Sequence, residues 1–414
     1  MNNIPAGYKQ TEVGVIPEDW QLRPLLSAVR VASGQVDPKI EPYRSMILVA
    51  PDHIESGSGR LLAKETAAYQ KAISGKYLFE NGDIVYSKIR PYLKKAILAD
   101  FEGLCSADMY PLKPAADVSA GFIFSLILGH RFTKYAESVS VRSGMPKINR
   151  QELAEYTIAL PPTKAEQEII AAALSDVDAL INSLDKLIAK KRDIKQGAMQ
   201  ELLTGKRRLP GFSGEWVVKR LGEIGTFRNG INKAKEDFGH GYPFVNLMDV
   251  FGVAKISLPI SFGLVNSTST ERELYDLMEG DVLFVRSSVK PSGVGLTTLI
   301  MENLPDTVFS GFLLRFRDEE VLTSEYKVHC FGETEFRKQL IASSTVSANT
   351  NINQVSLRRL HLLFPCEKTE QTAIATILSD MDAEIAVLER KRDKTRLLKQ
   401  GMMQELLTGR VRLN

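Results

Sequence analysis

Asp306, Glu325 and Lys327 have the spacing of a nuclease site, because Asp306 follows a proline and the other two read E-x-K. Two carboxylates and a lysine could hold Mg²⁺ and activate a water molecule. The pattern PD…ExK is loose enough to arise by chance in a chain of this length. An autonomous magnesium nuclease is therefore a minor alternative. It predicts magnesium-dependent DNA cleavage by the purified chain, abolished by Asp306→Ala.

The sequence contains few signs of any other catalytic chemistry. No GxxxxGK[ST] loop occurs, so ATP hydrolysis is not expected. Neither NPP nor DPP occurs, so the motif that holds a flipped adenine in amino-methyltransferases is missing, and DPK at 37–39 is the nearest match. The GVG at 293–295 is interpreted as a turn. His329 and Cys330 would point apart in a strand, so no metal site is predicted there. We expect no catalytic residue, no metal and no cofactor bound by this chain.

Composition is that of an ordinary globular chain. At 414 residues, 44% hydrophobic and 25% charged, there is room for roughly two to four domains. No run of 18 apolar residues and no signal peptide is found. Three cysteines, none in a CxxC spacing, favour a reducing cytoplasm. The net charge of +3 means that a nucleic-acid surface would have to be local.

One stretch of the chain occurs twice. Residues 166–209 and 370–413 align without a gap at an offset of 204 and are identical at 25 of 44 positions. Apolar residues recur in both at alternating steps of four and three, which is typical of the contact stripe, or seam, of a coiled coil. The predicted seam residues are Ile170, Leu174, Val177, Ile181, Leu184 and Ile188 in the first copy and Ile374, Leu378, Met381, Ile385 and Leu388 in the second.

Charges indicate how two such helices would pair. Each copy has five acids and one base in its first half and eight bases and two acids in its second. Parallel helices would repel, whereas antiparallel helices set acidic halves against basic halves. The basic halves, such as Lys190, Lys191 and Arg192, could also reach phosphates, but pairing with the acidic halves is favoured.

The segments between the helices diverge, although each begins at a tryptophan, Trp20 or Trp216, that is interpreted as a core anchor. Short apolar runs alternate with turns, which predicts mixed α/β structure. The prediction is an α+β chain with a pseudo-two-fold internal repeat, in which two mixed domains are separated by two long antiparallel coiled-coil helices. Its parts are 1–160, spacer helix 161–210, 211–365 and spacer helix 366–414. The C-terminus should lie near the N-terminus.

This combination resembles the specificity (S) subunit of type I restriction-modification systems, the HsdS family, over essentially the whole chain. The resemblance is carried by YKQTEVGVIPEDW (8–20), GDIVYSKIRP (82–91), SGMPKIN (143–149), LPGFSGEW (209–216) and the repeated helices. It implies two target recognition domains, each reading half of a bipartite, asymmetric site in double-stranded DNA, with the helices setting the gap. It also implies two modification subunits that bind S-adenosylmethionine and two restriction subunits that use ATP and magnesium. The S subunit itself is not catalytic.

If the chain reads DNA, polar and basic residues on protruding loops are the candidates. Those of the first domain are Ser87, Lys88, Arg90, Tyr92, Lys94, Lys95, Arg142 and Lys147, with Arg150 following. Those of the second are Arg228, Asn229, Asn232, Lys233, Arg286, Ser287, Ser288, Lys290 and Asn351. Asn149 and Asn353 share one repeat position and are interpreted as caps. Any single candidate could equally be a solvated surface residue.

Two further alternatives stay open. The chain could be an S-like subunit of a related bipartite-site system whose partner fuses methylation and cleavage. It could also be a scaffold that tethers two binding modules without reading DNA.

Overall fold

The computed structural model describes residues 4–141 and 144–413 and divides into two units. The first unit comprises Met1–Lys186 and Glu389–Asn414, and the second is Leu187–Leu388. Each unit therefore contains one mixed α/β domain and one half of each long helix. No helix among the described residues is long and apolar enough to cross a membrane.

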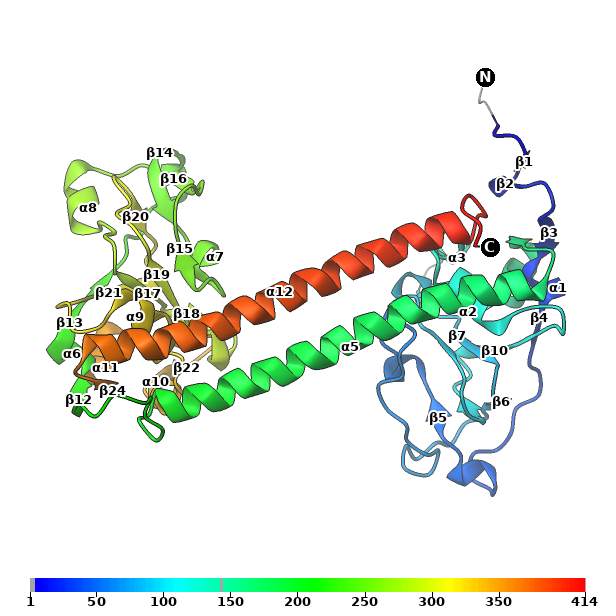
Figure 1. The fold of residues 1–414 in the computed structure, drawn as a ribbon, viewed down its shortest axis with the longest axis horizontal. Coiled ribbons are helices and arrows are strands. Elements are labelled where there is room, and N and C mark those ends of the chain that lie inside the picture. Colours follow the sequence, from blue (N-terminus) through cyan, green and yellow to red (C-terminus); the bar gives the residue numbers. More distant parts are fainter. Residues whose placement is uncertain (1–3, 142–143, 414) are drawn as a thin grey trace. The chain divides into compact units, whose positions relative to one another are not determined.

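The first unit is built around an antiparallel four-stranded sheet in the order β4-β10-β7-β8 (Figure 1). These strands are Val29–Val31, Met109–Pro114, Ile84–Ser87 and Ala96–Leu98. A smaller sheet, β5-β9-β6, is formed by Leu48–Val49, Gly103–Cys105 and Tyr77–Phe79. The remaining strands pair as β1-β2 (Tyr8–Thr11 and Gly14–Pro17) and β11-β3 (Thr157–Leu160 and Gln21–Pro24). The domain's helices are α1 (Leu25–Ala28), α2 (Ala120–Leu128), α3 (His130–Val139) and α4 (Arg150–Glu155).

The second unit repeats this plan with additions. Its main sheet runs β13-β21-β17-β19-β15, formed by Gly225–Asn229, Leu313–Asp318, Val282–Val285, Thr297–Ile300 and Lys255–Ile256. Smaller sheets are β16-β14-β20 (Gly263–Val265, Phe238–Val245, Val308–Phe309), β18-β23-β22 (Ser287–Ser288, Thr350–Asn351, Thr345–Val346) and β12-β24 (Trp216–Arg220, His361–Pro365). The domain's helices are α6 (Leu221–Ile224), α7 (Leu247–Val250), α8 (Ser269–Leu274), α9 (Ser324–Cys330), α10 (Thr334–Ala342) and α11 (Gln354–Arg359).

The two predicted long helices are confirmed as α5 (Lys164–Leu202) and α12 (Lys368–Leu406), each of 39 residues. At ~1.5 Å per residue each is about 58 Å long. All eleven predicted seam residues are buried or half-buried. The seam has a second role, however. Ile170 and Leu174 lie in the core of the first domain, and Ile374 and Leu378 lie in the core of the second.

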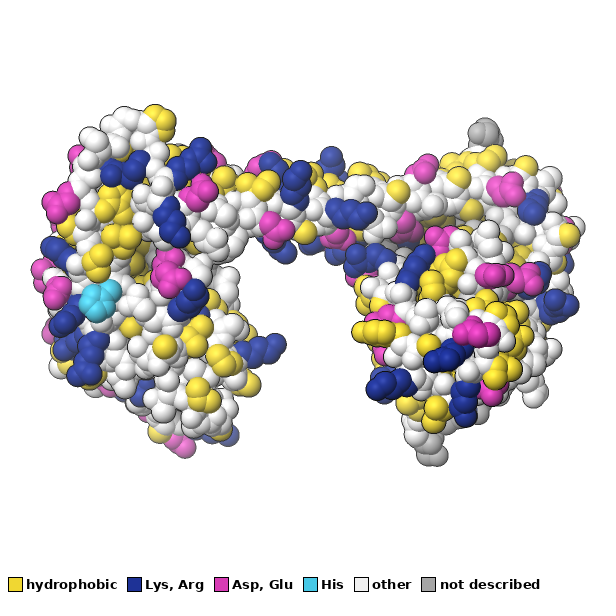
Figure 2. All heavy atoms as spheres, turned by 90° about the horizontal axis from the view of Figure 1, so that it is seen from below, with side chains coloured by type: hydrophobic (Ala, Val, Ile, Leu, Met, Phe, Trp, Pro, Cys, Tyr) yellow, Lys and Arg dark blue, Asp and Glu magenta, His cyan; other side chains and the backbone are white. Residues whose placement is uncertain are grey.

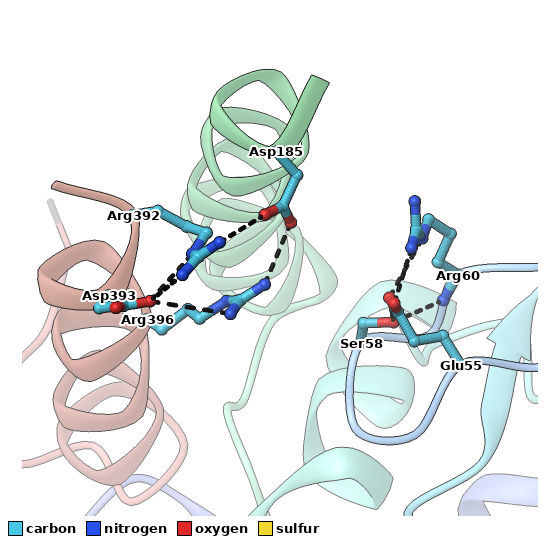
Figure 3. Close-up of polar contacts among 7 residues, drawn as sticks. All are labelled: Glu55, Ser58, Arg60, Asp185, Arg392, Asp393 and Arg396. Atoms are coloured by element: carbon cyan, nitrogen blue, oxygen red, sulfur yellow. Dashed lines mark hydrogen bonds and ion pairs between the residues drawn. The ribbon is translucent and has the colours of Figure 1, made fainter. Parts of the chain in front are cut away.

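Ion pairs join the two helix segments of the first unit. Asp178 pairs with Lys399 at 2.7 Å, and Asp185 accepts from both Arg392 (3.5 Å) and Arg396 (3.1 Å). Figure 3 shows the two guanidinium groups between the carboxylates of Asp185 and Asp393, each of which pairs with both arginines. As residue numbers rise along α5, those of the partners on α12 fall, so these segments run antiparallel.

The loop of residues 55–60 belongs to the same unit and carries its own ion pair, between Glu55 and Arg60 (Figure 3). The Arg60 guanidinium and the Ser58 hydroxyl lower the pKa of the Glu55 carboxyl by hydrogen bonding. This pair is thus kept in its charged form.

The second unit has the matching antiparallel pairs. Lys191 pairs with Glu384 at 2.6 Å, and Lys195 pairs with Asp382. The expectation that Lys191 pairs with the acidic half of the other helix is therefore confirmed. Lys195–Asp382 and Lys399–Asp178 are the same contact shifted by 204 residues.

A buried glutamine near the start of each helix makes the clearest repeated contact. Gln167 accepts from the amide of Ser119 (2.8 Å) and donates to the carbonyl of Pro161 (3.2 Å). Gln371 accepts from the amide of Thr323 (2.8 Å) and donates to the carbonyl of Pro365 (2.9 Å). Every partner is shifted by 204, so both helices are fastened to their domains in the same way.

Residues 8–19, near the N-terminus, contact residues 409–412, near the C-terminus, in the first unit, as the repeat predicted. The Tyr8 hydroxyl donates to the carbonyl of Gly409 (3.1 Å), and Arg412 pairs with Asp19 and Glu166. Trp20 is fully buried beside these contacts, which confirms its role as a core anchor.

His329 of α9 is buried against α12, where its Nε2 lies 2.9 Å from the hydroxyl of Ser379. Burial, and then the charge of nearby Lys195, lower its pKa to about 4, although Asp382 acts in the opposite direction. An unfolded chain binds this proton near pH 6.5. The folded second unit should therefore lose stability as the pH falls from about 6.5 to 4.

We expect the free energy of unfolding of the second unit to fall by about 2 kcal/mol between pH 7.5 and 5 because of His329. His329→Gln should remove this part of the pH dependence, whereas the same change at the exposed His361 should leave it. Urea unfolding at the two pH values, read by hydrogen–deuterium exchange of second-unit peptides, measures the difference. Equal pH dependence in wild type and His329→Gln would contradict the assignment.

Candidate nucleic-acid interface

Two of the predicted segments of the second domain lie side by side. β18 pairs with β23, which sets Ser287 opposite Asn351 and Ser288 opposite Thr350. The amide of Ile352 donates to the carbonyl of Arg286 at 2.9 Å. Residues 286–290 and 350–353, which are about 60 positions apart in the sequence, thus form one surface.

The first domain has the same arrangement. Ile89 and Lys147 form an antiparallel bridge, and the amide of Ile148 donates to the carbonyl of Lys88 at 2.9 Å. The amide of Arg90 donates to the carbonyl of Pro146. Residues 146–149 and 350–353, which correspond at the repeat offset of 204, therefore share one backbone frame.

Several predicted side chains, on this frame and near it in the sequence, are exposed. They are Arg90, Tyr92 and Lys147 in the first domain and Arg228, Asn229, Asn232 and Lys290 in the second. Lys88, Lys94, Ser287, Ser288 and Asn351 are half-buried. Lys88 and the exposed Arg150 both lie over the ring of Tyr110, at 5.4 and 5.9 Å from its centroid. Tyr110, which no sequence signal singled out, is thus a shared contact of both cations.

Other predicted residues are held by the protein itself. Ser87 is buried and its hydroxyl donates to the carbonyl of Ile89, while Lys95 donates to the carbonyl of Pro51 at 2.6 Å. Lys233 pairs with Glu271 at 2.8 Å, and this hydrogen bond lowers the pKa of the Glu271 carboxyl. Arg286 donates to the carbonyl of Gly311 at 3.2 Å. Their prediction as contact residues stands, but each would have to exchange or share an internal partner.

The cap interpretation of the two repeated asparagines is confirmed. The side chain of Asn149 accepts from the amide of Glu152, and that of Asn353 accepts from the amide of Ser356. They begin α4 and α11, so the extended segments that precede these helices end at the two asparagines. The predicted contact residue Arg142 lies outside the described residues.

The nuclease alternative is not supported by the surroundings of its residues. Asp306 pairs with Arg272 at 3.0 Å. Lys327 is buried and pairs with Asp318, and its Nζ also donates to the carbonyl of Gly280 at 2.9 Å. His329 and Cys330 lie in α9, not in a strand as was expected. Within residues 4–141 and 144–413, no group of three or more His, Cys, Asp or Glu side chains could hold a metal ion.

The positively charged side chains on the surface are not gathered into one large patch in the face shown in Figure 2. In the face shown in Figure 2, Lys and Arg side chains alternate with acidic and hydrophobic ones on each unit. This agrees with the small net charge and with an interface made of short loops rather than one wide basic surface.

Comparisons with known proteins all indicate the same family. The profile of the type I restriction modification DNA specificity domain matches residues 18–194 and 213–395. The EcoDI specificity subunit of Escherichia coli is 31% identical over 201 residues, which cover 48% of this chain and 44% of that relative. The putative MjaX specificity subunit of Methanocaldococcus jannaschii is 24% identical over 98% of this chain and 97% of its own length.

Solved structures share the fold. A chain from a type I R-M system superposes with a TM-score of 0.61 at 20% identity, covering 96% of this chain and 99% of that chain. The S subunit from M. genitalium gives 0.57 at 12% identity, covering 98% of this chain and 97% of its own. At these identities the likeness shows the fold alone.

Proposed function

Because this chain belongs to the type I restriction-modification specificity subunits, we propose that it is the non-catalytic, DNA-reading subunit of such a complex. The observation that carries the proposal is the same two-segment frame, presented twice with different side chains. A shared frame with unlike side chains suits two modules that read two different sequences. Each domain would read one half of a bipartite, asymmetric site in double-stranded DNA.

The two long helices would form an antiparallel coiled coil about a pseudo-two-fold axis and set the gap between the half-sites. Repeated contacts support this arrangement: Lys195–Asp382 and Lys399–Asp178 correspond, as do Gln167 and Gln371. Half-sites read from one face of DNA are centred about one turn apart, roughly 34 Å. A helix pair about 58 Å long can bridge such a distance.

Partner subunits would supply the chemistry. We expect two modification subunits, which bind S-adenosylmethionine and methylate adenine, and two restriction subunits, which use ATP and magnesium. The outer faces of the helices carry exposed apolar side chains that a partner could cover. Among them are Ile194, Val387, Leu397 and Leu398, which are 47%, 54%, 68% and 59% exposed.

Co-expression with the neighbouring modification subunit, followed by single-molecule sequencing of host DNA for N6-methyladenine, tests the function. The expected result is one new motif of two short specified halves around a fixed gap. Replacing residues 216–364 by the domain of a relative should then change one half only. If the two proteins bind each other and no new methylation appears, the scaffold alternative replaces the DNA-reading role.

Lys147 and Lys290 are the exposed lysines of the two recognition frames, and we expect them to contact phosphates. Replacing either with glutamine should weaken binding of all sequences alike. It should also reduce the slope of log affinity against log salt concentration by about 0.9. Filter binding of the complex at several salt concentrations measures both effects. Lys219→Gln, an exposed lysine on β12, is the control and should leave the slope unchanged.

A further inference from the structure

The short turn of residues 310–312 connects β20 to β21 in the second domain. The Ser310 hydroxyl accepts from the amide of Phe312 at 3.3 Å and so holds the turn. The Phe312 ring is 57% exposed, more than the rings of Phe238 (42%) and Phe251 (43%), whereas Phe284 and Phe316 lie in the core of this domain. A single exposed apolar side chain is ordinary on a protein surface, so its neighbours decide whether it has a role.

The turn lies between the frame segment 286–290 and the predicted polar segment 229–233. On one side, the amide of Arg286 donates to the carbonyl of Phe312 at 2.9 Å, and the Arg286 side chain donates to the carbonyl of Gly311. On the other side, the amide of Gly311 donates to the carbonyl of Ile231 at 2.7 Å. Four segments of the chain are thus joined in the order 229–233, 310–312, 286–290 and 350–353. The exposed ring lies in the second of them.

The first domain has the same turn at the repeat offset of 204. There the Ser106 hydroxyl accepts from the amide of Asp108 at 3.2 Å, and the amide of Lys88 donates to the carbonyl of Asp108 at 3.0 Å. Asp108 is exposed. The turn and its contact with the segment at Lys88 or Arg286 are therefore kept in both domains, while the side chain at its third position changes from a carboxylate to an apolar ring.

We infer that this turn is a third specificity-determining segment of each recognition domain, with Phe312 contacting a thymine methyl group and Asp108 accepting from a base amino group. In the major groove the methyl group is the apolar feature that marks thymine, and carboxylates accept from the amino group of cytosine. Adenine also presents an amino group there. The inference rests on the proposed function and deepens it, because it assigns one base in each half-site to one residue.

Replacing thymine by uracil removes only the methyl group and so tests Phe312 directly. Once the motif is known, each thymine of the half-site read by the second domain is replaced in turn by deoxyuridine. Binding is then measured for the wild-type complex with its modification subunits. One replacement should weaken binding about fourfold, as expected for one methyl group. The same replacement should have no effect on the Phe312→Ala complex.

Leu274→Ala, an equally apolar change at a 43% exposed residue of α8, is the matched control and should keep the full uracil effect. For the first domain, Asp108→Ala should relax the methylation motif at one cytosine or adenine of the other half-site only. An unchanged motif in both variants, with no uracil effect that depends on Phe312, overturns the inference while leaving the proposed function intact. Absence of any bipartite motif in the wild type would instead remove the proposed function.

Discussion

Lys327→Met should destabilise the second unit by about 3–5 kcal/mol, because it leaves the carboxylate of Asp318 buried without its counter-ion. Lys327 and Asp318 are only 5% and 4% exposed. Lys327 also donates to the carbonyl of Gly280, and Asp318 accepts from the amide of Leu322 at 3.0 Å. The pair therefore ties α9 to the main sheet and to the turn before β17. Urea unfolding read by hydrogen–deuterium exchange of second-unit peptides measures the loss.

Lys338→Met is the matched control, because it removes the same side chain from an ion pair that is 66% exposed on both sides. Exposed pairs contribute little, so we expect almost no change in the free energy of unfolding. Adding Asp318→Leu to Lys327→Met should restore part of the lost stability, since no buried charge then remains unpaired. Equal effects of Lys327→Met and Lys338→Met would show that the buried pair has no special role. The large expected effect also explains why Asp306, and not Lys327, is the informative residue for testing nuclease activity.

The long helices could be predicted because their signals are local and duplicated. Steps of four and three residues identify a helix, and its charge asymmetry identifies the antiparallel partner. The same periodicity could not show that Ile170 and Ile374 serve domain cores as well as the helix pair. A buried apolar residue looks alike in both settings, and the choice depends on which strands and helices fold against it.

The strand order of the two domains could not be predicted from the sequence, because it depends on contacts between residues far apart in the chain. β4 pairs with β10 and β5 pairs with β9 across more than 50 residues, and nothing in these short strands encodes the partner. Short strands with weak alternation of apolar and polar residues can therefore be recognised as strands, but their order in the sheet cannot be predicted.

Part of the candidate interface could be predicted from the sequence, and the internal repeat is the physical reason. Loop residues near equivalent repeat positions must lie in equivalent places, so 147–149 and 351–353 were found. Ser87 and Lys233 could not be evaluated, because their internal partners Ile89 and Glu271 are fixed only by the fold. The turn at Asp108 and Phe312 was missed because only Ser106 and Ser310 repeat there, and one shared serine is too weak a signal.

Inserting four helix-forming residues into both long helices should widen the gap between the two half-sites by one or two base pairs. The insertions belong between Lys186 and Leu187 in α5 and between Arg390 and Lys391 in α12, which are equivalent positions at the offset of 204. Four residues lengthen a helix by about 6 Å, and one base pair of DNA spans ~3.4 Å. Both helices are lengthened by the same number of residues at facing positions. The pairs Asp178–Lys399 and Lys195–Asp382, which lie on either side of the insertion, therefore keep their register. Sequencing of N6-methyladenine in cells that express the variant with its modification subunit reads the new gap directly.

Two further insertions separate the length of the helices from the length of the chain. Four residues added after Gly211, in an exposed turn, should leave the gap unchanged, because loops tolerate added length at little cost. Four residues added to α5 alone should disrupt the ion pairs on one side of the insertion and reduce methylation without defining a new gap. The proposal that the helices set the gap would fail if the double insertion methylated DNA at the original spacing. A wider gap with both half-site sequences unchanged would show that reading and spacing are carried by different parts of one chain.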